Sequence, residues 1–284
     1  MKKKILFLVL MLFIICSFNL LAKKSDENFK LPNTTYKLLE NFSQNKEKTI
    51  EKLKTLRKDE AVELYWRYYD ENVEFLQEMR ENLAKLLKDT SKGEYKKVEK
   101  ILDKYDLKFS TYSIPDSTDI GVDLELPQHF YYNIFKNYGT DAHRKYLKIT
   151  DGEEPSGKYN YETDEFRLLI TPQELGDRII ECENFLKEYS NINAEYDSYI
   201  KSCYNKYVAE YILEINGIML EGDGDGYADN GTPKISKKIL QEYDRFIKKY
   251  PNSKVTEFLK YFVKNYKNSN KRSIAWKKLG KLIN

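Results

Sequence analysis

The residues with the clearest chemical potential form an acidic, glycine-rich segment at positions 221–229. Carboxylates at alternate positions on a glycine-rich backbone suit a hard cation such as calcium, which takes several oxygen ligands. In the register of a calcium-binding loop Gly226 supplies the sharp turn, and the expected ligands are Glu221, Asp223, Asp225, Tyr227 through its carbonyl, and Asp229. Thr232 stands where such loops have a bidentate glutamate. The segment therefore has two interpretations, a calcium site or a solvated connection in which Gly and Asp form turns. No other cofactor is expected.

Thiol and metal chemistry is limited by the few cysteines and histidines, three and two respectively. Cys182 and Cys203 are the only cysteines beyond the first 22 residues, and together with His129 and His143 they do not have the spacing of a zinc site. In an exported chain the two thiols can form a disulfide. We keep the disulfide and two buried free thiols as alternatives.

Motifs of catalysis are absent from the sequence. It has no nucleophile elbow, no paired-histidine zinc motif, no phosphate-binding loop and no Cys-x-x-Cys. We assign no catalytic residue, and we expect His129 and His143 to be ordinary surface or groove residues. A pair of catalytic carboxylates among the 45 acids would be recognised only by its geometry, so an envelope hydrolase stays an alternative function.

The first 22 residues have the pattern of an export leader. Lys2–Lys4 form a basic start, residues 5–15 are apolar, and Ala22 is the expected last residue before cleavage. An uncleaved membrane anchor is one alternative, because the apolar stretch is borderline in length. Cleavage before Cys16 followed by lipidation is another, since the residues in front of it resemble the cleavage box of bacterial lipoproteins. In each case we expect the chain to be exported, as a periplasmic, outer-membrane-associated or secreted protein.

The net charge bears on the partners. The chain has a formal charge of +3, and the leader holds three lysines and no acid, so the remainder is near neutral. A neutral chain with 33% charged residues has no large basic field for nucleic acid or anionic lipid. We therefore expect a protein or peptide partner, no nucleic acid, and membrane attachment only through a lipid anchor or an uncleaved leader.

Apolar residues at helical spacing predict a mostly α-helical chain. After a polar tether at 23–33, we predict an N-terminal helical region over 34–150 that contains one long amphipathic helix at 60–88. The frequent Pro, Gly and Asp of residues 107–126 predict an irregular insert with a short strand pair. A polar loop at 150–164 is the predicted domain boundary.

The C-terminal region, residues 165–284, contains one segment twice at an offset of 61 residues. Thr171-Pro172 recurs as Thr232-Pro233, and the two copies end on similar Tyr-x-Asn sequences. Each threonine is predicted to cap a helix whose first residue is proline, because proline lacks the amide donor that would go unsatisfied there. The return helix of the first copy is predicted at 194–219. Each copy is therefore expected to form an antiparallel helical hairpin.

The end of the second copy carries a more specific pattern. It has the spacing Tyr-x-x-Phe-Ile-x-x-Tyr-Pro-x-Ser, made by Tyr243, Phe246, Ile247, Tyr250, Pro251 and Ser253. This pattern resembles the tetratricopeptide-type repeats of exported bacterial envelope proteins, which include outer-membrane assembly lipoproteins and coordinators of envelope constriction. The resemblance implies stacked antiparallel helical hairpins, a TPR-like α-solenoid, with a groove that binds a protein or peptide. The function it implies is that of a non-catalytic envelope scaffold.

Overall fold

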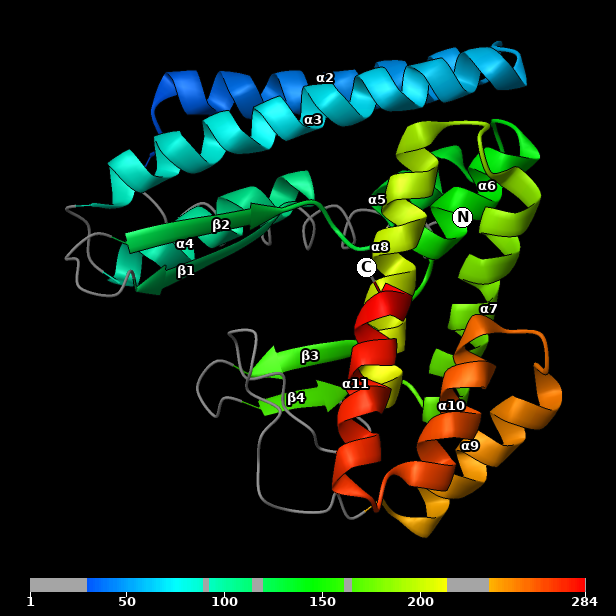
Figure 1. Ribbon diagram of the computed structural model, residues 1–284. Coiled ribbons are helices and arrows are strands. Elements are labelled where there is room, and N and C mark those ends of the chain that lie inside the picture. Colours follow the sequence, from blue (N-terminus) through cyan, green and yellow to red (C-terminus); the bar gives the residue numbers. More distant parts are fainter. Residues whose placement is uncertain (1–29, 89–91, 114–119, 161–164, 214–234, 284) are drawn as a thin grey trace, which may run out of the picture. The chain divides into compact units, whose positions relative to one another are not determined.

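The computed structural model describes residues 30–283, apart from 89–91, 114–119, 161–164 and 214–234 (Figure 1). The chain divides into two compact units, residues 1–128 and 129–284. The division precedes the polar loop predicted as the boundary, and that loop lies inside the second unit. None of the helices in the described residues is long and apolar enough to cross a membrane.

The first unit is organised around helices α2 (Asn33–Leu53), α3 (Lys58–Leu87) and α4 (Lys92–Leu102). The long amphipathic helix predicted at 60–88 is confirmed by α3. Its apolar stripe packs against α2, where the rings of Phe42 and Phe75 stack with their centroids 4.6 Å apart. Removing these side chains from water stabilises the helix pair, because apolar burial is the main favourable term in folding.

A β-hairpin follows α4 and packs on α3. Strands β1 (Lys108–Ser113) and β2 (Ile120–Glu125) are antiparallel, with Phe109 opposite Leu124. The Arg80 guanidinium of α3 donates a hydrogen bond of 2.6 Å to the Leu124 carbonyl. This hairpin confirms the strand pair predicted within residues 107–126.

The second unit begins with short elements and continues with long helices. The short elements are α5 (Phe130–Phe135), α6 (Asp141–Leu147), the π-helical turn η2 (Lys148–Gly152), and the antiparallel strands β3 (Gly157–Asn160) and β4 (Glu165–Leu168). The longer helices are α7 (Pro172–Tyr189), α8 (Ala194–Ile212), α9 (Lys237–Lys249), α10 (Lys254–Asn265) and α11 (Ser269–Ile283). The hairpin β3–β4 is a correction, since the sequence predicted only a polar loop at 150–164.

Helices α7 and α8 form the first helical hairpin, and α7 begins as predicted. The Thr171 hydroxyl accepts a hydrogen bond of 3.2 Å from the Glu174 amide, and the Glu174 carboxylate accepts one of 2.8 Å from the Thr171 amide. This capping box satisfies two amides that the helix itself leaves unpaired. Asn193 caps the start of α8, where its side-chain oxygen accepts a hydrogen bond of 2.7 Å from the Glu195 amide.

Helices α9 and α10 form the second hairpin, whose start differs from the prediction. The prediction that Thr232-Pro233 caps this helix is wrong, because α9 starts at Lys237 and the Ser236 hydroxyl accepts from the Ile239 amide at 3.3 Å. A serine four residues further on supplies the same kind of cap. Thr232 and Pro233 lie outside the described residues. Helix α11 follows and packs on both α10 and α8.

Candidate functional site

Several predicted sites fall in parts of the chain that the structure does not describe. The ligands Glu221, Asp223, Asp225, Tyr227 and Asp229 lie outside the described residues, as do the leader and Cys16. Among the residues that are described, no three histidine, cysteine or carboxylate side chains converge as a metal site. Calcium binding, export and lipidation therefore stay predictions.

The two cysteines predicted as a disulfide pair lie on the two helices of the first hairpin, and both are free thiols. Burial raises the pKa of the Cys182 thiol, and Cys203 raises it further through its proximity. A thiol with a raised pKa is a poor nucleophile, because the thiolate is the reactive form. The disulfide between Cys182 and Cys203 stays a prediction.

The two histidines lie in different surroundings. His143 of α6 is fully buried, with its Nδ1 2.8 Å from the Tyr196 hydroxyl oxygen, and burial lowers its pKa to about 4. The expectation of a surface or groove position is therefore wrong for His143. His129 precedes α5, and its Nδ1 lies 2.5 Å from the Asp151 carbonyl oxygen, a bond that raises its pKa.

A pair of carboxyl groups meets where η2 packs against α7. Glu153 forms an ion pair of 3.0 Å with Arg178, and the two side chains are only 12% and 13% exposed. Burial raises the pKa of Glu153, and the nearby Glu181 carboxyl raises it further. Burial also opposes ionisation of Glu181, but hydrogen bonds from Glu153 and Lys148 lower the pKa of Glu181 overall. Burial and the nearby Glu181 therefore favour the neutral form of Glu153, whereas the Arg178 guanidinium favours its charged form.

Each carboxyl group of this pair has a cationic partner in the protein. A glycosidase-like pair is recognised by the separation of its two carboxyl groups, and the hydrolase alternative stays a prediction. Glu153 is paired with Arg178 of α7, and Glu181 is paired with Lys148 of η2. The two ion pairs join η2 and the residue that follows it to α7.

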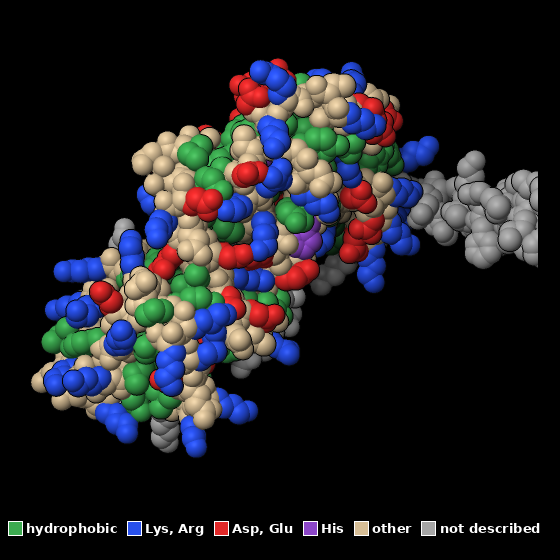
Figure 2. Space-filling view, turned by 90° about the vertical axis from the view of Figure 1, so that its right-hand side faces the viewer, with side chains coloured by type: hydrophobic (Ala, Val, Ile, Leu, Met, Phe, Trp, Pro, Cys, Tyr) green, Lys and Arg blue, Asp and Glu red, His purple; other side chains and the backbone are tan. Residues whose placement is uncertain are grey.

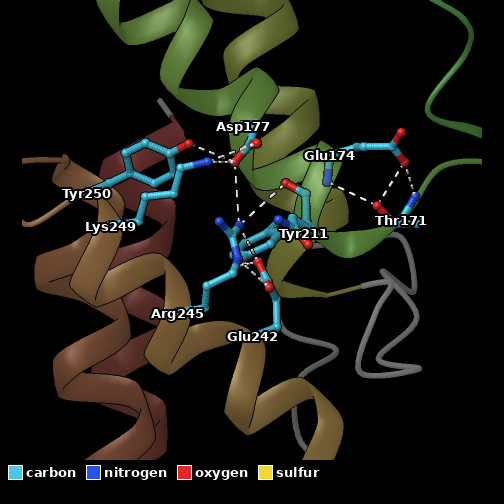
Figure 3. Close-up of polar contacts among 9 residues, drawn as sticks. Thr171, Glu174, Asp177, Tyr211, Glu242, Arg245, Lys249 and Tyr250 are labelled. Atoms are coloured by element: carbon cyan, nitrogen blue, oxygen red, sulfur yellow. Dashed lines mark hydrogen bonds and ion pairs between the residues drawn. The ribbon is translucent and has the colours of Figure 1, made fainter.

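A second polar network fixes α9 against the first hairpin (Figure 3). Asp177 of α7 accepts hydrogen bonds from the Tyr250 hydroxyl at 2.7 Å and from the Lys249 ammonium at 3.2 Å. Arg245 bridges Asp177 and Glu242, at 3.5 and 2.7 Å. Burial opposes ionisation of Asp177, but these donors lower its pKa overall. The network sets the position of α9 and thereby of α10, which follows it.

A close helix contact lies beside this network. Gly176 of α7 faces the Phe246 ring of α9, and a Cβ atom at position 176 would lie 3.0 Å from that ring. The missing side chain lets the aromatic ring of α9 pack directly on the backbone of α7. The second hairpin is therefore held close to the first by a polar network and by a small residue.

A groove lies on the second unit between the hairpin α7–α8 and the helices α10 and α11. It has a volume of about 560 Å³. Its apolar lining comes from Leu186, Tyr204 and Leu282, and Asn205 and Asn252 add carboxamides. Four lysines, one from each helix, complete it: Lys187, Lys201, Lys254 and Lys281. The groove therefore combines an apolar surface with several cationic and amide donors.

The one carboxylate of the groove lining is occupied by donors of the protein. Glu183 of α7 accepts hydrogen bonds from the Ser253 hydroxyl at 2.9 Å, from the Lys254 amide at 3.2 Å and from the Tyr204 hydroxyl at 3.3 Å. Its position at the first residues of α10 is favourable for an acid, because a helix N-terminus carries partial positive charge. Burial nevertheless raises the pKa of Glu183.

The groove lysines lack the close carboxylate partners of Lys145 and Lys148, which line a neighbouring hollow that also includes Lys187. In that hollow, which has a volume of about 680 Å³, Lys145 is paired with Glu188 at 2.7 Å and Lys148 with Glu181. Within the described part of the chain, none of the groove lysines has a carboxylate oxygen within 4.0 Å of its ammonium nitrogen. With four lysines and one carboxylate, Glu183, the groove lining has an excess of positive charge.

The C-terminal helices show a charge that the sequence analysis missed. Residues 236–284 contain 14 lysines and arginines and three acids, a net charge of +11, although the chain without its leader is near neutral. The part of the molecule where α9, α10 and α11 lie is accordingly rich in lysine side chains (Figure 2). Counting charge segment by segment, rather than over the whole chain, would have revealed it.

No family model, no characterised protein and no solved structure matches the chain.

Proposed function

We propose that this chain is a non-catalytic binding protein of the cell envelope, and that its second unit holds an acidic segment of a partner protein in the groove between α7, α8, α10 and α11. The observation that carries the proposal is the excess of positive charge around an apolar groove, where four lysines face one carboxylate and none of them forms an ion pair within 4.0 Å in the described residues. A partner segment with carboxylates next to apolar side chains would match both parts of this lining.

The chemistry of the groove suits recognition of such a segment. An exposed lysine–carboxylate pair contributes about 0.2–1 kcal/mol, so several are needed for useful affinity. Burial of the apolar side chains adds a favourable contribution to the binding free energy, and salt does not screen this contribution. Asn205 and Asn252 can bind the peptide backbone, since a carboxamide both donates and accepts hydrogen bonds.

The arrangement of hairpins agrees with a repeat scaffold. The first hairpin, helix α10 of the second hairpin and the C-terminal helix α11 supply the walls of the groove, and stacked hairpins are what the resemblance to tetratricopeptide-type repeats implies. We include a TPR-like stack in the proposal, together with export by the leader. Both the repeat family and the compartment rest on the sequence patterns described above.

The proposal is tested with a labelled peptide in which glutamate alternates with leucine. Fluorescence anisotropy gives its Kd for the chain that begins at Lys23, and for the variant Lys187→Glu/Lys201→Glu. We expect the double variant to bind about tenfold more weakly or worse, since each exposed ion pair contributes up to ~1 kcal/mol and its reversal adds repulsion. A peptide with glutamine in place of glutamate should bind weakly to both proteins.

The matched control changes the same net charge away from the groove. Lys237 and Lys238 of α9 are exposed and line no part of it, so Lys237→Glu/Lys238→Glu should change the Kd by about twofold or less through long-range screening alone. Equal losses in both double variants, with helix content unchanged by circular dichroism, would show that net charge and not the groove determines binding. Absence of binding by the unmodified chain would remove the proposed function.

A further inference from the structure

We propose that the outer surface of the helix pair α10–α11 binds an anionic lipid bilayer. The surface, called here the Tyr261 patch, consists of Tyr261, Lys264, Lys271, Ile274 and Lys278. This inference goes beyond the proposed function and uses none of the groove lysines, so each can fail without the other.

The patch is built across the seam between two antiparallel helices. The Tyr261 hydroxyl of α10 donates a hydrogen bond of 3.4 Å to the Lys271 carbonyl of α11. The Lys278 ammonium lies 5.1 Å from the centroid of the Tyr261 ring. Lys271, Ile274 and Lys278 share one face of α11, because residues three, four and seven apart on a helix lie on the same side. Tyr261 thus lies between two lysines that are about two turns apart.

The same face carries an exposed aliphatic side chain. Ile274 is 48% exposed, one turn from both lysines of α11 that contact Tyr261. On α10, Lys264 is exposed and lies one turn beyond Tyr261. In the described residues no carboxylate lies within 4.0 Å of the ammonium groups of Lys264, Lys271 or Lys278. Helix α11 contains no acid, and α10 contains only Glu257.

A bilayer explains this combination better than a soluble polyanion. Lysines spread over the outside of two helices match a continuous anionic surface, to which each adds attraction within a Debye length. Ile274 can enter the boundary between headgroups and acyl chains, and a tyrosine ring is stable at that depth. A nucleic acid would be expected to stack a base on the aromatic ring. The Tyr261 ring is half-buried and is covered by Lys278 instead.

The Tyr261 patch and the groove use different lysines, so the chain can bind a lipid surface through the patch and a protein segment through the groove. Helix α10 starts at Lys254 and α11 ends at Ile283, so the groove residues Lys254 and Lys281 lie near one end of the pair. Lys264 and Lys271 lie at the other end, next to the connection between the helices.

The test is cosedimentation of the chain that begins at Lys23 with two kinds of vesicle. One kind contains phosphatidylcholine mixed with phosphatidylglycerol, and the other phosphatidylcholine alone. Starting at Lys23 removes the apolar leader, which would itself bind lipid. We expect binding to the mixed vesicles only. The variant Lys264→Glu/Lys271→Glu/Lys278→Glu should lose about a hundredfold in partition coefficient, at roughly fivefold for each lysine near the surface.

Two further variants separate the patch from net charge. Ile274→Ser keeps every charge and should weaken binding severalfold. The control Lys48→Glu/Lys52→Glu/Lys85→Glu makes the same change in net charge on exposed lysines of the first unit and should reduce binding far less. Circular dichroism confirms that each variant is folded.

The outcomes decide between the patch and its alternatives. No binding to phosphatidylglycerol vesicles, or equal binding to both vesicle types, overturns the proposal. Equal losses in the two triple variants also overturn it, because binding would then follow net charge. Displacement of the protein from mixed vesicles by polyglutamate at matched ionic strength, with no effect of Ile274→Ser, would assign the patch to an acidic protein instead. If Lys264→Glu/Lys271→Glu/Lys278→Glu loses vesicle binding but keeps the Kd of the unmodified chain for the glutamate–leucine peptide, the result supports the Tyr261 patch and leaves the groove proposal standing.

Discussion

Acid should destabilise the second unit through His143. The imidazole of this α6 residue is fully buried beside Tyr196 of α8, and burial lowers its pKa to about 4. In the unfolded chain the pKa returns to about 6.5. The folded state therefore excludes a proton that the unfolded state binds, so the stability contributed by the neutral ring is complete above the unfolded pKa. It is lost progressively as the pH falls from 6.5 toward the folded value.

The magnitude follows from the two pKa values. Between about pH 7.5 and about pH 5 the unfolded state gains about 2 kcal/mol from protonation of this one group, because folded His143 stays mostly neutral over that interval. The complete loss, at about 1.4 kcal/mol per pKa unit, approaches about 3 kcal/mol below the folded pKa. His143→Gln keeps a hydrogen-bonding side chain and removes this titration.

Urea unfolding at the two pH values measures the effect. In a Trp66→Phe background the fluorescence of Trp276 reports on the second unit, which contains His143. The parent should lose about 2 kcal/mol more than His143→Gln on acidification, since titration of the carboxyl groups is common to both proteins. His129→Gln is the control of opposite sign, because the pKa of His129 is raised and its protonation favours the folded state at low pH. Equal losses in the parent and in His143→Gln would refute the reasoning.

Three further predictions concern the helix contacts and the acidic segment. Gly176→Val should lower the free energy of unfolding by about 1–3 kcal/mol through overpacking against Phe246. Gly280→Ala should raise it by about 0.5–1 kcal/mol, because no atom lies within 4 Å of the added Cβ. Urea unfolding curves measure both changes. Asp177→Asn should cost about 1 kcal/mol in the same assay, since the carboxylate is partly exposed and screened. If residues 221–229 bind calcium, the Tm will fall on chelation, and an unchanged Tm contradicts the site.

The parts of the fold that were predictable from the sequence depend on local signals. The apolar periodicity of α3 and the Thr171–Glu174 capping box lie within a few residues of the structure that they specify. The start of α9 was predicted wrongly because two capping signals, Thr232 and Ser236, compete four residues apart. Which one a helix uses depends on its packing, and α9 is positioned by its contacts with α7. The β3–β4 hairpin has short strands in a polar sequence, which give a weak periodic signal.

The candidate site was less predictable than the fold. The groove lysines come from four helices and are spread from residue 187 to residue 281, so no local spacing relates them. The contact between Glu153 and Glu181 likewise depends on how η2 meets α7. The Tyr261 patch differs, because its charge belongs to one basic segment that a whole-chain average concealed. The net charge of residues 236–284 can be read from the sequence when charge is counted over that segment alone.

Helix α7 explains why the groove remains positively charged. Its acids are engaged by donors from different neighbours: Asp177 by α9, Glu181 by Lys148 of η2, Glu183 by the start of α10, and Glu188 by Lys145 of α6. These acids hold the surrounding elements in place, so they are not available to neutralise Lys187 on the same helix or Lys201 on the next. Losing one of these acids would therefore change the shape of the groove more than its charge. The lysines, in contrast, hold no other element, and reversing them should change binding with little effect on the fold.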